Sequence, residues 1–196
     1  MNNNIKCTSI ALFFLFVAIS ITNPIVANAQ TGYTRLLTYK DPQGMFSINY
    51  PQGWDVKPAT NRFQNYLVQF TQSQGGIGNS SAIFVITANN VTSDTRDYII
   101  YNMIPNLNQS PLNIKITKGI ECTKYMMSGH NACSLIYSGS ALPNTSFERM
   151  FGAMAVATQV NGTLYLILFL SFPHMFQKNL PVVEKMISSF KIGPND

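Results

Sequence analysis

The sequence feature that most constrains the fold is a hairpin centred on Asn161-Gly162. Asn-Gly between two apolar runs is the strongest short-range signal for a two-residue β-turn. Such a turn fixes the cross-strand pairs, which are Met154 with Phe169, Ala155 with Leu168, and Val156 with Ile167. Both faces of the hairpin are therefore apolar, and neither can be left to water. The sequence predicts that strands 149–160 and 163–172 lie centrally in a sheet covered on both faces.

The C-terminal segment supplies one cover for this sheet. Its apolar residues fall on one stripe of a helix: Leu180, Val183, Ile187 and Phe190. Asn179 is the expected N-cap, and Pro181 then falls in the first turn, where proline is tolerated. The row of alanines opposite Leu168 leaves room for a helix to approach closely. We therefore expect Leu168 to be buried beneath this helix.

A second helix is predicted between the strands, where the apolar period changes from two residues to helical spacing. The residues that show this spacing are Ile99, Ile100, Met103, Ile104 and Leu107. Thr92 or Ser93 is the expected N-cap, and Asp94 and Asp97 lie near the positive end of the helix dipole. Pro105 is expected to kink or end the helix, because proline cannot donate the backbone hydrogen bond.

The rest of the chain is predicted to be mainly antiparallel strands. In the stretch 39–54, Asp41-Pro42-Gln43-Gly44 is typical of a turn, and residues 45–50 alternate so that Phe46, Ile48 and Tyr50 share one face. Further strands are expected at 33–40, 63–70, 82–88, 114–127 (one long or broken strand) and 132–138. The fold class is therefore α+β, a predominantly antiparallel sheet sandwiched between helices.

The N-terminal residues predict export. An uninterrupted apolar run at 10–21 is followed by Ala27-Asn28-Ala29, the small-x-small pattern of a signal-peptide cleavage site. The alternative is an uncleaved membrane anchor, but this run is shorter than the roughly 18 to 20 residues that span a bilayer. We therefore expect residues 1–29 to be a signal peptide that takes Cys7 with it. Residues 30–196 then form a single secreted or extracytoplasmic domain with no transmembrane segment.

The charged residues do not predict a nucleic-acid partner. Only 11% of the chain is charged, and the basic side chains are scattered singly rather than clustered. Nucleic-acid binding requires a basic patch or stripe on one face of a domain. An ordinary solvated surface is the better interpretation of this pattern.

Cys122 and Cys133 are the two cysteines of the expected mature chain, and export favours a disulfide between them. A two-residue turn at Ser128-Gly129 would place them diagonally on one face, about 7 to 8 Å apart. A longer turn or a bulge would bring them together. Two buried thiols, or a metal site that also uses His130, are the alternatives; three ligands at irregular spacing are a weak zinc signal.

No recognised catalytic constellation is present in the sequence. His130 and His174 are the two histidines, and there is no Gly-x-Ser-x-Gly, HExxH or CxxC motif. The eight acidic residues are dispersed, so a paired-carboxylate glycosidase is disfavoured. The glycine-rich stretch 75–78 precedes a strand rather than a helix and therefore lacks the context of a phosphate-binding loop. No catalytic residue, metal ligand or cofactor is predicted.

Five Asn-x-Ser/Thr sequons occur in the chain. Asn79, Asn90 and Asn144 fall in predicted loops and are the candidate glycosylation sites. Asn108 is followed closely by Ser110-Pro111, and Asn161 is needed in the hairpin turn, so these two are weaker candidates.

The order of motifs resembles the PsbP-like family, whose fold is shared with the Mog-type Ran-binding proteins. The resemblance lies in the N-terminal pattern Tyr39-x-Asp41-Pro42-x-Gly44-x-Phe46-Ser47-Ile48-x-Tyr50-Pro51-x-Gly53-Trp54, the Asn161-Gly162 hairpin, and the C-terminal pattern Met186-Ile187-x-Ser189-Phe190-Lys191-Ile192. It implies an antiparallel sheet between helical layers, and extracytoplasmic or lumenal members that act as non-catalytic accessory factors. The named member is an extrinsic photosystem II subunit that helps retain calcium and chloride, but no residue set here matches a family ion site.

The resulting expectation is a secreted, non-catalytic PsbP-like accessory or binding domain that acts on an unidentified extracytoplasmic protein or membrane complex. One alternative is an extracytoplasmic hydrolase or metal-dependent enzyme, which should bring titratable groups together in a pocket. Another is a small-ligand or polysaccharide binder, which should have a deep apolar pocket. A protein-binding module should instead expose apolar or aromatic side chains.

Overall fold

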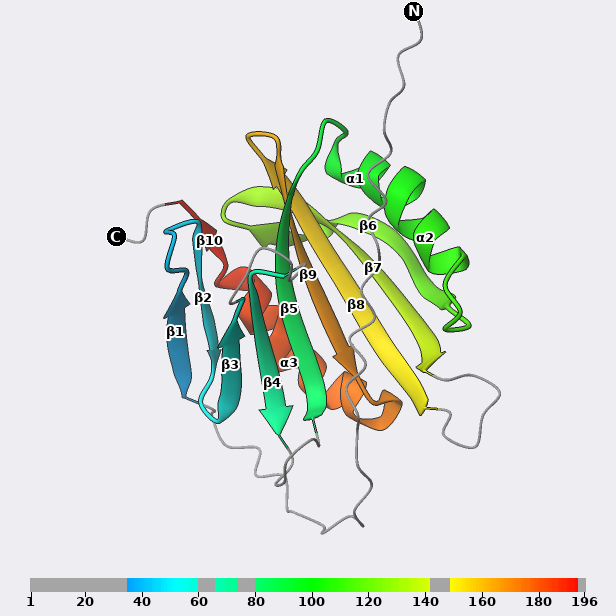
Figure 1. The fold of residues 1–196 in the computed structure, drawn as a ribbon, viewed down its shortest axis with the longest axis horizontal. Coiled ribbons are helices and arrows are strands. Elements are labelled where there is room, and N and C mark those ends of the chain that lie inside the picture. Colours follow the sequence, from blue (N-terminus) through cyan, green and yellow to red (C-terminus); the bar gives the residue numbers. More distant parts are fainter. Residues whose placement is uncertain (1–34, 60–65, 74–79, 142–148, 194–196) are drawn as a thin grey trace, which may run out of the picture.

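The structure, a computed structural model, describes residues 35–59, 66–73, 80–141 and 149–193. The strands in these ranges are β1 (Leu36–Lys40), β2 (Phe46–Pro51), β3 (Trp54–Pro58), β4 (Val68–Ser73), β5 (Ser80–Asn90), β6 (Lys115–Met127), β7 (His130–Ala141), β8 (Arg149–Val160), β9 (Thr163–Ser171) and β10 (Lys191–Ile192). They form a seven-stranded antiparallel sheet, ordered β3-β4-β5-β9-β8-β7-β6, and a three-stranded sheet, ordered β1-β2-β10 (Figure 1).

The β8–β9 hairpin lies inside the large sheet, with β5 on one side and β7 on the other, so its predicted central position is confirmed. Its register is also the predicted one, with Ala155 opposite Leu168 and Val156 opposite Ile167. Asn161 and Gly162 have φ values of 51° and 79°, as the mirror-image turn of a tight hairpin requires.

The two faces of the hairpin belong to two separate hydrophobic cores. Met154, Val156, Ile167 and Phe169 point into one core, which contains the helix α3 (Pro173–Ser188). Ala153, Ala155, Ala157, Leu164 and Leu166 point into the other core, beneath a helical segment at 95–108. The predicted class, an antiparallel sheet between helical layers, is therefore confirmed.

The position of Leu168 was predicted wrongly. Leu168 is only partly buried, and it packs against the core on the opposite face from α3. Leu180, Val183 and Ile187 of α3 pack in the other core, with Ile167 and Phe169 of β9. Both faces of β9 are apolar, so the sequence pattern is nearly the same on each face. The pattern therefore does not show which helix covers which face.

The start of α3 also differs from the prediction. The helix begins at Pro173 with Phe172 as N-cap, so Asn179 is not a cap but a buried residue within the helix. Pro173 occupies the first turn, where its missing N–H costs no helical hydrogen bond. Pro181 is therefore inside the helix, where it has no backbone N–H to donate to the carbonyl one turn earlier. Burial of Phe176, which stacks on Phe169 with centroids 5.4 Å apart, favours the longer helix.

The other helical segment changes its winding along its length. It comprises α1 (Thr95–Tyr98), a π-helical turn η1 (Ile99–Met103) and α2 (Ile104–Asn108). The N-cap is Asp94 rather than Thr92 or Ser93, and its Oδ1 accepts a hydrogen bond from the Asp97 amide at 2.8 Å. Pro105 neither ends the segment nor lies deep in a regular helix. The π-turn ends just before Pro105, which lies in the first turn of α2.

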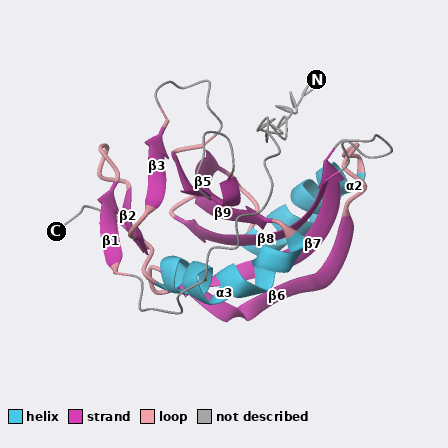
Figure 2. Cartoon of the chain, turned by 90° about the horizontal axis from the view of Figure 1, so that it is seen from below, coloured by secondary structure: helices cyan, strands magenta, loops and turns pink. Residues whose placement is uncertain are grey.

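Strands wrap around α3 from several directions, because the helix contacts β2 of the small sheet as well as β5, β6, β8 and β9 (Figure 2). The C-terminal strand β10 links the small sheet to the β6–β7 turn. Ser128 in that turn donates its amide to the Phe190 carbonyl at 3.0 Å, and its Oγ accepts the Ile192 amide at 2.9 Å. The helix is thereby enclosed by strands that lie far apart in sequence.

The N-terminal stretch folds largely as predicted. Phe46 and Ile48 are buried on one face of β2. The chain then turns at Gly53, with φ of 91°, and continues into β3, a strand that the sequence pattern did not reveal. Of the strand expected at 63–70, residues 63–65 lie outside the described part. Tyr66 and Leu67 are not in a strand, and β4 runs from Val68 to Ser73.

Replacing Ile167 and Leu168 separately by alanine tests which face of β9 carries more of the stability. Ile167 is fully buried against the α3 core, so Ile167→Ala should lower the free energy of unfolding by about 2 to 5 kcal/mol. Leu168→Ala, an adjacent truncation of equal size, should cost clearly less because that side chain is partly exposed. Denaturant melts measure both, and an equal or larger loss at Leu168 would contradict this assignment.

Candidate functional site

The register of the edge strand β6 shifts three times along its length. Near the turn, Tyr125 lies opposite Ala132, but further along Glu121 lies opposite Ser134. Three residues of β6 therefore face one residue of β7, and the extra residues form a β-bulge. This bulge corrects the diagonal offset that a regular hairpin would give.

The bulge brings Cys122 and Cys133 together, and a disulfide joins them. Cys133 is the single β7 residue opposite the bulge, while Cys122 is the first residue of the bulge in β6. With Cys122 joined to Cys133, Thr123 and Lys124 are the two extra residues. Two buried thiols or a metal site with His130 are not what the structure shows.

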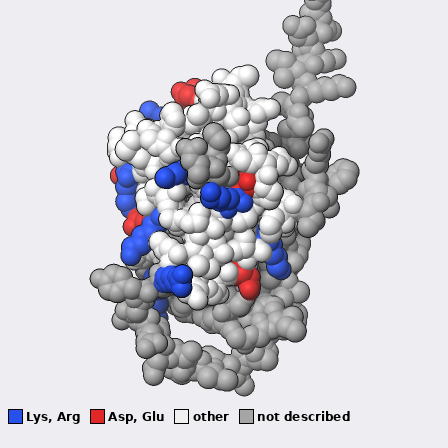
Figure 3. Space-filling model, turned by 90° about the vertical axis from the view of Figure 1, so that its left-hand side faces the viewer, with Lys and Arg blue, Asp and Glu red and all other residues white. Residues whose placement is uncertain are grey.

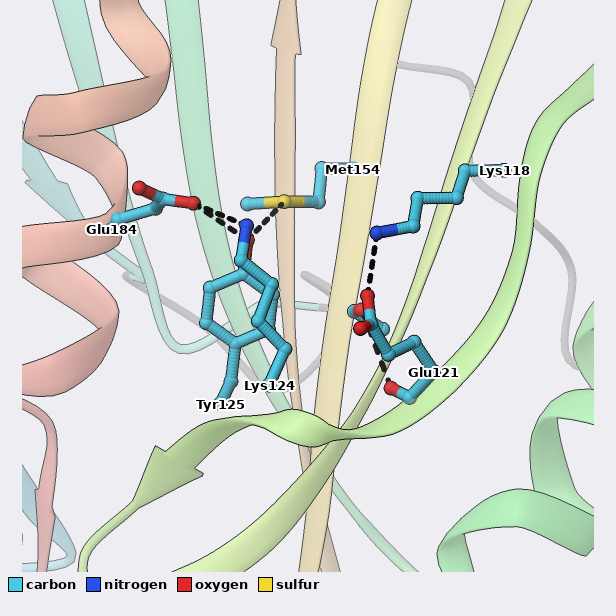
Figure 4. Close-up of polar contacts among 7 residues, drawn as sticks. Lys118, Glu121, Lys124, Tyr125, Met154 and Glu184 are labelled. Atoms are coloured by element: carbon cyan, nitrogen blue, oxygen red, sulfur yellow. Dashed lines mark hydrogen bonds and ion pairs between the residues drawn. The ribbon is translucent and has the colours of Figure 1, made fainter.

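Residues at and next to this bulge form a connected cluster of ionisable side chains with α3 (Figure 4). Lys124 Nζ lies 2.7 Å from Glu184 Oε1 of α3 and 2.7 Å from the Tyr125 hydroxyl. The Tyr125 hydroxyl donates to the same Glu184 oxygen at 2.8 Å and lies 3.8 Å from Met154 Sδ. The Lys124 ammonium also sits 4.6 Å from the centre of the Tyr125 ring, a cation–π distance. We call Lys124, Tyr125 and Glu184 the β6–α3 clasp.

The clasp holds each of its groups in its ordinary charge state. The hydrogen bond to Glu184 raises the pKa of Lys124, and the hydrogen bond from Lys124 lowers the pKa of Glu184. Burial raises the pKa of the Tyr125 hydroxyl. All three pKa values move away from neutrality, whereas a general acid or base works best with a pKa near the working pH. The arrangement is suited to fastening β6 to α3.

No motif or periodic pattern in the sequence predicts this clasp. Lys124 and Glu184 are 60 residues apart, and their contact depends on the bulge that turns Lys124 towards α3. A second ion pair, Lys118 with Glu121 at 2.6 Å, lies within β6 itself and does not reach another element.

A buried carboxylate lies near the start of the described chain. Asp41 is 7% exposed, and its Oδ2 accepts the amides of Gln43 and Met45 at 3.0 and 3.1 Å. These bonds shape the β1–β2 turn, as an Asx turn does. Burial, followed by the Asp41 charge, raises the pKa of both Tyr39 and Tyr165. The hydroxyls therefore stay protonated, and Asp41 is explained by its structural role in the turn.

The remaining candidate residues do not converge. His130 begins β7 and is exposed, while the His174 ring stacks on Phe172 at 6.0 Å at the start of α3. Of the glycosylation candidates, Asn90 is exposed at the end of β5. Asn79 and Asn144 lie outside the described residues, as does the glycine-rich stretch 75–78.

Neither a metal centre nor a membrane-spanning helix is found in the described ranges. No three His, Cys, Asp or Glu side chains there are grouped so as to hold a metal ion. No helix among these residues has the length and apolar character needed to cross a bilayer.

Similarity to known proteins lies in the fold. No protein-family model matches the chain. No curated protein matches it in sequence. Among solved structures, cyanobacterial PsbP (CyanoP) from Synechocystis has a TM-score of 0.50 at 13% identity, covering 87% of this chain and 99% of that one. The yeast Ran-binding protein Mog1p from Saccharomyces cerevisiae has a TM-score of 0.52 at 8% identity, covering 82% and 96%.

A third similar structure is LpqN from Mycobacterium tuberculosis, described as involved in cell envelope biogenesis. Its TM-score is 0.53 at 10% identity, covering 83% of this chain and 93% of that one. The chain therefore has the PsbP/Mog-like fold, as the sequence motifs indicated. At such low identities the likeness concerns the fold alone.

Removal of the disulfide should destabilise the protein moderately. The bond joins residues 11 positions apart, and closing a loop of roughly this length in the unfolded chain contributes about 2 to 3 kcal/mol. The double variant Cys122→Ser/Cys133→Ser should lose that amount in denaturant melts, and reductant should weaken the wild type similarly. Thr123→Ser, an exposed substitution that leaves both cysteines in place, is the control and should change little. An unchanged double variant would show that β6 keeps its register without the bond.

Glu184→Gln tests the clasp through its pH dependence. Both charged side chains are more than a third exposed, so the loss at neutral pH should be about 0.2 to 1 kcal/mol. Because the folded-state pKa of Glu184 is lowered, its contribution is present above the unfolded pKa and lost as the pH falls through the folded value. The difference between wild type and variant should therefore vanish in acid.

Chemical denaturation along a series from neutral to acidic pH provides this measurement. Glu121→Gln is the matched control, because it removes an ion pair that stays within β6. A stability difference at Glu184 that persists unchanged in acid would contradict the clasp.

Proposed function

We propose that this protein is a non-catalytic, extracytoplasmic binding domain that acts on a protein partner or a membrane-associated complex. The observation that carries the proposal is that the ionisable side chains of the β6–α3 clasp bind one another. Its lysine, tyrosine and glutamate have pKa values moved away from neutrality, and they bind one another rather than leaving a group directed at a substrate. This favours a structural use of the ionisable groups over an enzymatic one.

The disulfide supports the extracytoplasmic part of the proposal. Structural disulfides persist mainly in oxidising compartments outside the cytoplasm. The N-terminal apolar run and the Ala27-Asn28-Ala29 site are consistent with such a location. LpqN and CyanoP lend fold-level analogy only.

An exposed aromatic side chain supports a protein-binding role. Tyr101 lies in the π-helical turn η1 and is 72% exposed, the largest exposure among the large apolar side chains in the described ranges. Tyrosine buries a large area at little entropic cost and is enriched at protein interfaces. The helical segment that carries it covers the sheet with its other side, so Tyr101 is free to meet a partner.

Crosslinking in the native envelope tests this role. We expect Tyr101→Ala to weaken crosslinking to the partner roughly tenfold, as the loss of a binding hot spot does. Asn102→Ala is the matched control, since Asn102 is exposed on the same turn, and it should crosslink like the wild type. Equal crosslinking by both variants would exclude Tyr101 from the interface.

The non-catalytic part has its own test. Alanine at both His130 and His174 should leave the biological role largely intact, because His130 is exposed, the His174 ring stacks on Phe172, and the described residues bring neither histidine into a group of three His, Cys, Asp or Glu side chains. A turnover assay in which either single variant loses activity would overturn the proposal. N-terminal sequencing of the native protein should begin at or near Gln30.

A further inference from the structure

The outward side of α3 carries positive charge and no uncompensated negative charge. Four exposed side chains follow one another along a stripe of the helix, three or four residues apart: His174, Lys178, Pro181 and Lys185. The single acidic residue of α3, Glu184, is half-buried, and its carboxylate binds Lys124 and the Tyr125 hydroxyl. The clasp therefore neutralises the only carboxylate of the helix, and the stripe presents a net positive charge to solvent.

Lys191 adds a third positive charge just beyond the end of α3. It is exposed in β10, and its neighbours Phe190 and Ile192 face the core, so its side chain points outward. Lys178, Lys185 and Lys191 form no ion pair with any described residue. We call these three residues the α3 lysine band. Figure 3, which looks onto the small sheet and β10, shows basic side chains set apart from one another by uncharged surface.

The opposite layer of the molecule has a different surface. The helical segment at 95–108 covers the other face of the β8–β9 hairpin from α3. The exposed charges at its start are Asp94, Arg96 and Asp97, which together are net negative. The exposed Tyr101 also lies on this segment. Positive charge and the exposed aromatic side chain are thus on opposite sides of the sheet.

The α3 lysine band offers charge without an apolar anchor. The apolar side of α3, with Phe176, Val183 and Ile187, is buried in the core, so the helix has no apolar face left to insert elsewhere. None of the large apolar side chains that are exposed in the described ranges lies on α3. Protein interfaces are depleted in lysine and depend on aromatic or arginine anchors. Single-stranded nucleic acids require a basic groove with stacking aromatics, whereas this band lies on the outer side of one helix.

We propose that the α3 lysine band is a docking surface for the anionic headgroups of a lipid bilayer. A bilayer presents a plane of negative charge, to which dispersed lysines are attracted without any pocket. Each lysine close to such a surface strengthens binding about fivefold. The contact is electrostatic and peripheral, so it weakens as the salt concentration rises. This surface is additional to the proposed protein-binding role, because Tyr101 faces away from a membrane that α3 contacts.

Co-sedimentation of the full chain with lipid vesicles tests the docking. The wild type should bind vesicles of mixed phosphatidylcholine and phosphatidylglycerol more tightly than vesicles of phosphatidylcholine alone, and high salt should abolish the difference. Lys178→Gln/Lys185→Gln should weaken binding to the anionic vesicles about 25-fold, since two lysines are lost. Residues 10–21 are the same in every variant, so the apolar run does not affect the comparison.

The matched control is Lys57→Gln/Arg96→Gln. It removes two exposed positive charges as well, but from β3 and α1 rather than from α3. This variant should bind anionic vesicles nearly as the wild type does. Thermal melts of both double variants establish that they are folded.

Glu184→Gln gives a test of opposite sign. It removes the only carboxylate of α3 and leaves the charge of Lys124 uncompensated beside the lysine band. Binding to anionic vesicles should therefore become about fivefold tighter, although the protein loses a stabilising ion pair. A merely structural effect of Glu184 would weaken binding or leave it unchanged.

No binding to anionic vesicles at low salt, or equal binding to neutral and anionic vesicles, would overturn the proposal. An equal loss in the Lys57/Arg96 control would do so too. Lysine variants that lose crosslinking to a protein but keep their vesicle binding would show that an acidic protein meets this band instead. Tyr101→Ala should bind vesicles like the wild type, so this result and the crosslinking result at Tyr101 can fail separately.

Discussion

The constraint on which the structure depends is the two-sided burial of the β8–β9 hairpin. Ile167 and Phe169 on one face and Leu164 and Leu166 on the other must all leave water, so the sheet needs a helical layer on each side. α3 supplies one layer, and the helical segment at 95–108 supplies the other. The alanine row of β8 decides how near the second layer can approach. An edge position for this hairpin would leave large apolar surfaces exposed.

The two-sided burial of the hairpin is accompanied by a second feature, the enclosure of α3 by strands of both sheets. The helix packs on both sheets, and β10 returns immediately after it to bond to β2 on one side and to Ser128 on the other. The β6–α3 clasp adds a polar contact at the far edge of the large sheet. Because its charges are partly exposed, its contribution to stability is small beside that of the apolar contacts around Phe176 and Val183.

The disulfide lies next to the polar contact between Lys124, Tyr125 and Glu184, because both are at the bulge in β6. Cys122 and Cys133 join β6 to β7 at the bulge, and Lys124 and Tyr125, which follow in β6, contact Glu184. A residue pair that the sequence suggested on grounds of compartment thus has a structural role of its own. The same bulge blunts one edge of the large sheet, whereas β1 at the edge of the small sheet is regular.

The sequence by itself determined the parts that rest on local chemistry. Asn161-Gly162 fixed a turn and its register, because the dipeptide adopts positive φ readily, and alternation placed Phe46 and Ile48 on a buried face. Only the tertiary structure decided which helix covers Leu168, where α3 begins, and how β6 shifts to join its cysteine to Cys133. The Lys124–Glu184 contact belongs to the same group. These features depend on packing between segments distant in the chain, and such packing leaves no periodic or motif signal in the residues themselves.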